Sequence, residues 1–166
     1  MEKALEVVVG ELLRQRGIKL AVAESCTGGL IGHRLTDVPG ASDYYLGSVT
    51  AYAFEAKRRL LGVRAETLQT FGAVSRETAL EMARGVRQAM VDETPSDAVI
   101  GLSVTGIAGP GGGTAEKPVG LVWIALSTPD GDWAWQFIWP FDRAGNKAAS
   151  AQQALQLVAH YLTGMF

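Results

Sequence analysis

The sequence is poor in the residues that build disulfides and zinc sites. It has a single cysteine, Cys26, so no disulfide can form within the chain, and its two histidines, His33 and His160, lie far apart. Without a Cys-x-x-Cys pair or a Cys/His cluster, we expect no metal site. No apolar run is long enough to span a membrane, and the first residues lack the apolar region of a signal peptide. We therefore expect a cytoplasmic protein with no membrane contact.

The sequence also lacks an excess of positive charge. Its 15 lysines and arginines face 17 aspartates and glutamates, which gives a net charge of −2. Binding to nucleic acid needs a basic face, so we expect no nucleic-acid partner, although a local pocket for one phosphate is compatible with this charge. A chain of 166 residues, 48% hydrophobic and 19% charged, instead predicts one globular domain covering residues 1–166.

Along the chain, hydrophobic spacing changes between the helical and the strand pattern. The predicted strands are 18–23, 44–52, 98–104, 121–126 and 133–139. The predicted helices are 5–16, a short one ending at 35, 53–61, 75–91 and 144–162. Helices first alternate with strands, and a hairpin with its turn at 128–131 then follows. This order predicts an α/β fold of three layers, with a mixed, mostly parallel sheet and helices on both faces.

A polar turn follows the first predicted strand. Its sequence is Glu24-Ser25-Cys26-Thr27-Gly28-Gly29, so Ser25 lies at the carboxyl end of a strand, where open α/β sheets bind ligands. Backbone N–H groups near Gly28 and Gly29, at the start of the next helix, can bind an anion or a developing oxyanion. The alternative is that Ser25 or Thr27 only caps that helix.

A tyrosine and a lysine follow the second predicted strand. Tyr52 ends the strand, and Lys57 lies in the second turn of the next helix. Because helical side chains lean toward the helix N-terminus, Lys57 is expected near Tyr52. In a partly dry cleft such a lysine can lose its charge at neutral pH and accept a proton from a serine. The alternative is a solvated lysine beside Arg58 and Arg59.

A glycine-rich loop leaves the third predicted strand, from Thr105 and Gly106 through Gly109 to Gly113. Such loops often bind phosphates through N–H groups, but this one has neither the Gly-Lys-Ser/Thr of a Walker loop nor the spacing of a dinucleotide motif. The alternative is a flexible connection, although the length and glycine density of the loop slightly favour binding.

An arginine stands at the predicted junction between the last strand and the last helix. Arg143 follows Asp142, a candidate N-cap, and can bind a phosphate or carboxylate with two hydrogen bonds. The alternative is a surface arginine paired with a neighbouring acid.

Taken together, these segments resemble the CinA C-terminal domain family over nearly the whole chain. The motifs that carry the resemblance are Ala23-Glu24-Ser25-Cys26-Thr27-Gly28-Gly29, Tyr52 with Glu55-Ala56-Lys57, Leu61-Gly62-Val63, Gly72-Ala73-Val74-Ser75, Thr105-Gly106-Ile107-Ala108-Gly109-Pro110, Glu116-Lys117-Pro118-Val119-Gly120 and Asp142-Arg143. The resemblance implies an amidohydrolase that converts nicotinamide mononucleotide into nicotinic acid mononucleotide and ammonia without a cofactor. It also implies a homodimer, to which the tryptophan-bearing strand 133–139 could contribute.

The resemblance implies a role for each candidate residue. Ser25 matches the nucleophile, and Tyr52 and Lys57 match its proton-transfer partners. The residues expected to contact the substrate are Thr27, Gly28, Gly29, Thr105, Gly106, Gly109 and Arg143.

The sequence departs from the family pattern at several polar positions. Ala53 and Phe54 replace a serine and an asparagine, Gly111 replaces an aspartate, and Lys147 replaces an arginine. The polar groups lost at Ala53, Phe54 and Gly111 leave a second interpretation open: a nucleotide-binding or regulatory module of the family with weakened catalysis. A third interpretation is an amidase for a related small amide.

Overall fold

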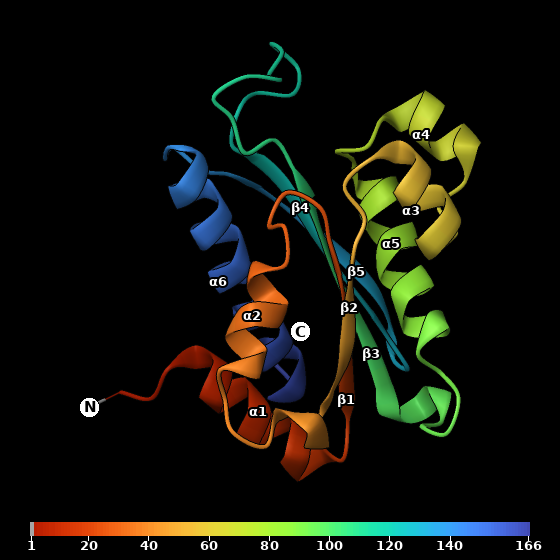
Figure 1. The fold of residues 1–166 in the computed structure, drawn as a ribbon, viewed down its shortest axis with the longest axis vertical. Helices are drawn as coiled ribbons and strands as arrows, with labels where there is room; N and C mark the ends of the chain where they lie inside the picture. Colours follow the sequence, from red (N-terminus) through yellow and green to blue (C-terminus); the bar gives the residue numbers. More distant parts are fainter. Residues whose placement is uncertain (1) are drawn as a thin grey trace.

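The computed structural model describes residues 2–166 and has three layers, a five-stranded sheet between two groups of helices (Figure 1). Helices α1, α2 and α6 cover one face, and α3, α4 and α5 cover the other. The predicted α/β class and the helices on both faces are confirmed. In chain order the elements are α1 Leu5–Arg16, β1 Lys19–Glu24, α2 Leu30–Thr36, η1 Ala41–Asp43, β2 Tyr45–Thr50, α3 Phe54–Leu61, α4 Ala65–Phe71, α5 Arg76–Ala89, η2 Ser96–Ala98, β3 Val99–Gly106, β4 Leu121–Thr128, β5 Gly131–Ile138 and α6 Arg143–Leu162.

The sheet is mixed and mostly parallel, as predicted. Its strand order is β2-β1-β3-β4-β5. β1 pairs with β2 and β3 in parallel, whereas β3–β4 and β4–β5 are antiparallel, so every strand except β4 points the same way. The chain passes from β1 to β2 through α2 on one face and from β2 to β3 through α3, α4 and α5 on the other. β1 is therefore the point where the winding reverses, and open α/β sheets bind ligands at the carboxyl end of such a point.

Alternating side chains on β1 divide the core between the two faces. Leu20 and Val22 belong to the cluster that packs with α1, α2 and α6, and Ala21 and Ala23 belong to the cluster beneath α3, α4 and α5. All four side chains are fully buried. The small alanines let α5 lie close to the sheet, and Gly101 on β3 does the same, because a Cβ there would lie 2.2 Å from a carbonyl oxygen of α5.

The predicted N-cap at Asp142 is confirmed, and α5 and α1 also have a capping residue at one end. Ser75 caps α5 by accepting a hydrogen bond from the N–H of Thr78 (3.1 Å), and Asp142 caps α6 through the N–H of Gly145 (2.8 Å). Gly17 ends α1 in the left-handed conformation, with φ at 63°.

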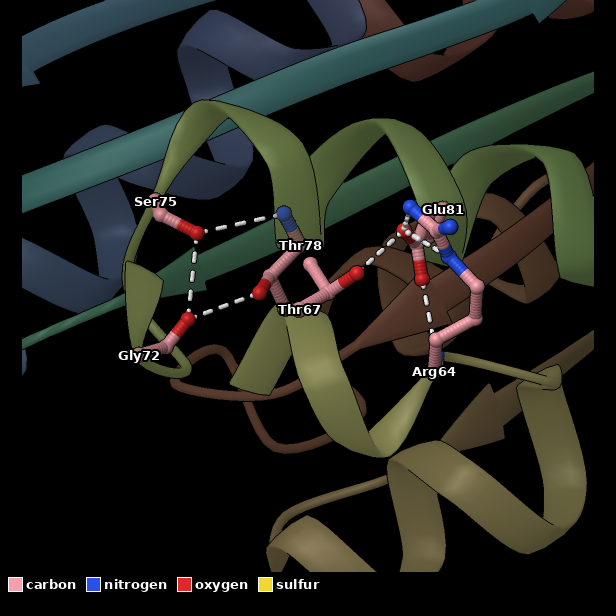
Figure 2. Close-up of polar contacts among 6 residues, drawn as sticks. All are labelled: Arg64, Thr67, Gly72, Ser75, Thr78 and Glu81. Carbon is pink, nitrogen blue, oxygen red and sulfur yellow. Dashed lines mark hydrogen bonds and ion pairs between the residues drawn. The ribbon is translucent and has the colours of Figure 1, made fainter. Parts of the chain in front are cut away.

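The predicted order of elements is wrong at one place, because it lacks α4. This helix has no side-chain cap, and its sequence, AETLQTF, has few apolar residues to mark a helical face. Tertiary contacts hold it instead: the carboxylate of Glu81 on α5 accepts hydrogen bonds from the backbone N–H of Arg64 (2.8 Å), its Nε (3.1 Å) and the hydroxyl of Thr67 (2.6 Å), as Figure 2 shows. Nearby, Ser75 and Thr78 both donate to the carbonyl of Gly72. We call the Glu81 contacts the α4 clamp.

No helix within residues 2–166 is long and apolar enough to cross a bilayer.

Candidate active site

Three strand ends meet at one edge of the sheet, because β1, β2 and β3 run parallel. The N–H of Ser25, just after β1, donates to the carbonyl of Val104 on β3 (3.0 Å). The N–H of Ala51, just after β2, donates to the last carbonyl of β1 (2.8 Å). These bonds place Ser25 between the segment of Tyr52 and the segment of Thr105, so the structure brings together candidates that lie far apart in the sequence.

Lys57 makes a direct contact with Ser25. Its Nζ donates to Ser25 Oγ (2.8 Å) and to the backbone carbonyls of Ala51 (2.9 Å) and Tyr52 (2.9 Å). Only 1% of Lys57 is exposed, although the other charged residues of α3, Glu55, Arg58 and Arg59, are exposed. The prediction that Lys57 leans back toward Tyr52 in a dry cleft is confirmed, and the alternative of a solvated lysine is wrong.

Burial changes the proton affinity of this lysine. Loss of hydration lowers the pKa of Lys57 to about 8, because a buried ammonium is penalised more than a buried amine. Among residues 2–166, no carboxylate forms an ion pair with Lys57 that would reverse this effect. Burial also raises the pKa of the neighbouring Cys26 thiol to about 12, so this thiol stays protonated and is a poor nucleophile.

The three partners of Lys57 fix the direction of its lone pair. A neutral amine has two N–H groups and one lone pair, and the carbonyls of Ala51 and Tyr52 can only accept. The two N–H groups therefore go to the carbonyls, and the lone pair faces the hydroxyl of Ser25. This is the geometry in which a base takes a proton from a nucleophile.

The turn after Ser25 has both engaged and free N–H groups. Gly28 and Gly29 have φ angles of 62° and 101°, a region that glycine adopts without strain. The N–H of Gly28 donates to the carbonyl of Ser25 (3.0 Å) and is already engaged. Within residues 2–166, the N–H groups of Cys26, Thr27 and Gly29 donate to no other residue. Of the two glycines predicted to supply an oxyanion donor, only Gly29 therefore has a free N–H, and Cys26 and Thr27 offer two more.

The sequence interpretation missed Glu24, the last residue of β1. Its side chain is fully buried, and its carboxylate accepts hydrogen bonds from the hydroxyl of Thr27 (2.7 Å) and the N–H groups of Ile31 (2.9 Å) and Gly32 (3.0 Å). The sequence did contain a signal for this role. Gly29, the residue that precedes α2, has no side chain with which to cap the helix, so the first N–H groups of α2 need an acceptor from another residue.

On the other side of Ser25, the end of β3 is fixed to the loop before α5. The hydroxyl of Thr105 is buried and donates to the carbonyl of Ala73 (2.7 Å). A Cβ at Gly106 would lie 2.6 Å from a methyl group of Val122, so only glycine fits there. Both residues line the edge where Ser25 lies, and their contact with a substrate stays a prediction.

Arg143 joins the glycine-rich loop to Tyr52. One guanidinium nitrogen donates to the carbonyl of Gly109 (2.7 Å), and another donates to the hydroxyl of Tyr52 (3.2 Å). Both partners are neutral, so the guanidinium has no counter-ion among the described residues. The side chain of Tyr52 is exposed, and only its backbone carbonyl contacts Lys57. A proton relay through the Tyr52 hydroxyl stays a prediction.

A cavity of about 840 Å³ lies between the glycine-rich loop and the start of α6. Two cations, Arg143 and Lys147, line it together with an apolar wall, and Lys147 Nζ is 3.7 Å from where a Cβ of Gly28 would lie. The cavity therefore borders the turn that carries Ser25. Among residues 2–166, no three His, Cys, Asp or Glu side chains are grouped as a metal site requires. The full lining is Leu30, Ala108, Pro110, Val119, Phe141, Asp142, Arg143, Ala144 and Lys147.

Asn146 is a second residue that the sequence interpretation missed. It is buried, its amide nitrogen donates to the carbonyl of Ala108 (3.0 Å), and its Oδ1 accepts from the N–H of Phe141 (3.1 Å). It thereby fixes the glycine-rich loop to the first turn of α6, next to Arg143.

The fold and the site define an α/β domain with a serine–lysine pair at the carboxyl edge of its sheet, an arrangement in which a serine can act as a nucleophile. The chain belongs to the CinA family: the model of the CinA C-terminal domain matches residues 2–162.

Named relatives and solved structures agree with this assignment. The chain is 48% identical over 163 residues to a putative competence-damage inducible protein of Desulforamulus reducens, covering 98% of this chain and 38% of that protein. It is 49% identical to a protein of the same description from Halothermothrix orenii, covering 99% of this chain and 39% of that protein. The chain thus spans less than two-fifths of these curated relatives.

Solved structures match the chain along nearly their whole length. The competence/damage inducible protein CihA of Agrobacterium tumefaciens superposes with a TM-score of 0.86 at 38% identity, covering 98% of both chains. The competence damage-inducible protein A of Klebsiella pneumoniae superposes with a TM-score of 0.88 at 33% identity, covering 96% of this chain and 95% of that one.

Proposed function

We propose that this domain hydrolyses the carboxamide of nicotinamide mononucleotide to nicotinic acid mononucleotide and ammonia. The observation that supports the proposal most directly is the contact between Ser25 Oγ and Lys57 Nζ, with the pKa of Lys57 lowered to about 8 by burial. An amide is a poor electrophile with a poor leaving group, so its hydrolysis needs an activated nucleophile, a stabilised oxyanion and a proton for nitrogen.

The site offers a group for each of these needs. Lys57 accepts the proton of Ser25 as Oγ attacks the amide carbon, and the free N–H groups of Cys26, Thr27 and Gly29 in the turn after β1 are the candidate donors for the oxyanion. Lys57 then gives that proton to the amide nitrogen, the C–N bond breaks, and ammonia leaves. Water, deprotonated by Lys57, hydrolyses the nicotinoyl ester and restores Ser25.

The cavity fits the rest of such a substrate. Arg143 and Lys147 are two cations beside an apolar wall, which suits a nucleotide whose ring carries a ribose phosphate. We also propose, from the family resemblance, that the domain is a cytoplasmic homodimer.

None of the side chains at the replaced positions 53, 54 and 111 supplies a hydrogen bond to Ser25 or Lys57. Phe54 and Gly111 are exposed, and a Cβ at Gly111 would meet nothing within 4 Å. Their loss therefore leaves the contact between Ser25 and Lys57 unchanged, which favours an active enzyme over a module with weakened catalysis.

The test is release of ammonia from three amides: nicotinamide mononucleotide, nicotinamide riboside and nicotinamide. We expect turnover of the mononucleotide and a large loss of kcat/KM without the phosphate. Equal rates for all three would contradict the role of Arg143 and Lys147 and favour an amidase of broader range. No ammonia from any of the three would favour the regulatory module.

A further inference from the structure

We propose that Glu24 is a positioning residue that holds the Ser25 turn in the geometry needed for attack. The inference rests on the proposed function only where turnover of the mononucleotide is the readout. Glu24 touches neither Lys57 nor the cavity lining, so it would act through the backbone of the turn.

Glu24 fixes the turn at both of its ends. Its backbone carbonyl accepts from the N–H of Ala51 (2.8 Å), which ties the end of β1 to β2. Its carboxylate accepts from the N–H groups of Ile31 (2.9 Å) and Gly32 (3.0 Å), which ties β1 to the first turn of α2. Residues 25–29 lie between these two ties, so the freedom of Ser25 depends on both.

The middle of the turn is held by the same carboxylate. The hydroxyl of Thr27 donates to Oε1 of Glu24 (2.7 Å), which orients the peptide that carries the free Thr27 N–H. One side chain thus sets the place of the nucleophile and of a candidate oxyanion donor. Misplacement of reacting groups by about 1 Å can cost about 100-fold in rate.

Other residues of the chain cannot easily replace this carboxylate. Gly28 and Gly29 carry no side chain that could cap α2, and Glu24 is fully buried, so water does not substitute for it. Among residues 2–166, no cation pairs with Glu24, and its three donors are all neutral. A glutamine has the same shape but presents an NH₂ group to one of these donors, which leaves a buried N–H or O–H without an acceptor.

The α4 clamp gives a matched control. Glu81 also accepts from a backbone N–H and from a threonine hydroxyl, those of Arg64 and Thr67 (Figure 2), but it lies on α5 and makes none of its hydrogen bonds to residues 25–29. Glu81→Gln therefore changes a similar set of contacts without touching the turn. A general loss of stability would affect both variants, whereas a loss of positioning would affect only Glu24→Gln.

The experiment measures two rates on Glu24→Gln, Glu24→Asp and Glu81→Gln at a temperature where circular dichroism shows each variant folded. The first is the rate at which an alkyl fluorophosphonate modifies Ser25, followed by intact mass: Oγ attacks phosphorus, fluoride leaves and the proton passes to Lys57. The second is kcat and KM for nicotinamide mononucleotide. We expect both Glu24 variants to lose about 100-fold in modification rate and in kcat at unchanged KM, and Glu81→Gln to match the wild type.

The outcomes separate the two proposals. If wild-type Ser25 is modified but no ammonia forms, the proposed substrate is wrong, and the modification rates still test Glu24. Wild-type modification rates in a folded Glu24 variant, or an effect on KM alone, would overturn the positioning role. If neither Glu24 variant folds, Thr27→Val removes one of the three donors, and full modification of Ser25 in that variant would equally overturn it.

Discussion

Lys57 and Glu81 are two largely buried ionisable residues, and their surroundings drive their pKa values toward opposite charge states. Lys57 has only neutral partners, a hydroxyl and two carbonyls, and burial lowers its pKa to about 8. Burial also raises the pKa of Glu81, but hydrogen bonds from Thr67 and Arg64 and the charge of Arg64 lower it by more, so its net shift is downward. Burial thus shifts Lys57 toward its neutral amine, whereas the partners of Glu81 shift that residue toward its carboxylate.

The difference separates a reactive group from an anchoring group. A lysine that loses its charge near neutral pH can exchange a proton with Ser25 in each cycle. A glutamate held in its charged form by Arg64 keeps its contacts across the working pH range and only stabilises α4. Lys57, whose partners carry no opposite charge, is therefore the residue of the two that can change its charge state during a reaction.

Among the substitutions considered, Ser25→Ala should cause the largest loss of activity. Loss of the nucleophile should lower ammonia release on the order of 10⁴–10⁶-fold. The fold should remain, because the variant loses one side-chain hydrogen bond, that with Lys57, and such a bond is worth about 0.5–1.5 kcal/mol. The measurement is ammonia release together with thermal unfolding, and near-normal turnover by a folded variant would disprove the assignment of Ser25.

Changing Lys57 should give the next largest effect. Lys57→Ala should lower kcat by about 10²–10⁴-fold, the usual contribution of a positioned base. Lys57→Arg should be about as poor, because arginine keeps the charge but cannot give up a proton at workable pH. An active arginine variant would reduce Lys57 to a binding charge.

The pH profile of the wild type tests the same group. The amine is the reactive form, so kcat/KM should rise with pH through one ionisation near 8 and level off above it, because burial lowers the pKa of Lys57 to about 8. A profile that is flat between pH 6 and 9, roughly one to two pH units either side of that value, would mean that Lys57 does not control the rate.

Arg143→Ala should have an intermediate effect, and mainly on KM. A hydrogen bond to a charged group is worth about 1.5–3 kcal/mol, so KM should rise about 10- to 100-fold with a smaller change in kcat. Arg58, which is exposed on α3, offers the matched control, and Arg58→Ala should leave both constants unchanged. A large fall in kcat at constant KM would contradict a binding role for Arg143.

Glu81→Gln should have the smallest effect on turnover and should act on stability alone. Loss of charged hydrogen bonds to Arg64 and Thr67 should lower the free energy of unfolding by about 1–3 kcal/mol. Chemical denaturation measures this loss, and steady-state kinetics should show wild-type constants. A clear fall in kcat would show that the α4 clamp and the Ser25 site are coupled, which would contradict a purely anchoring role for Glu81.

Local patterns in the sequence were enough to predict most of the secondary structure and the residues that meet at the site. The strand ends at Ser25, Tyr52 and Thr105 could be placed together, since parallel strands align their carboxyl ends. Lys57 could be placed near Tyr52 from the direction of helical side chains. Helix α4 could not be predicted, because its stability comes from Glu81, which lies beyond the reach of any local pattern.

The role of Tyr52 shows a similar limit. The sequence places the residue correctly, but the tertiary structure directs its hydroxyl to Arg143, 91 positions away, and presents only its carbonyl to Lys57. The direction of an exposed side chain depends on which residues folding brings next to it, and the sequence alone does not show which residues these are.

The periodicity of the strands and helices, the glycines of the turn after Ser25 and the residue types of a serine–lysine site can all be read from the sequence. The burial of Lys57 without a counter-ion and the contacts by which Glu24 holds the turn arise only when the chain folds. The physical reason is that periodicity arises between near neighbours in the chain, whereas desolvation and hydrogen-bond geometry depend on every group that folding brings close.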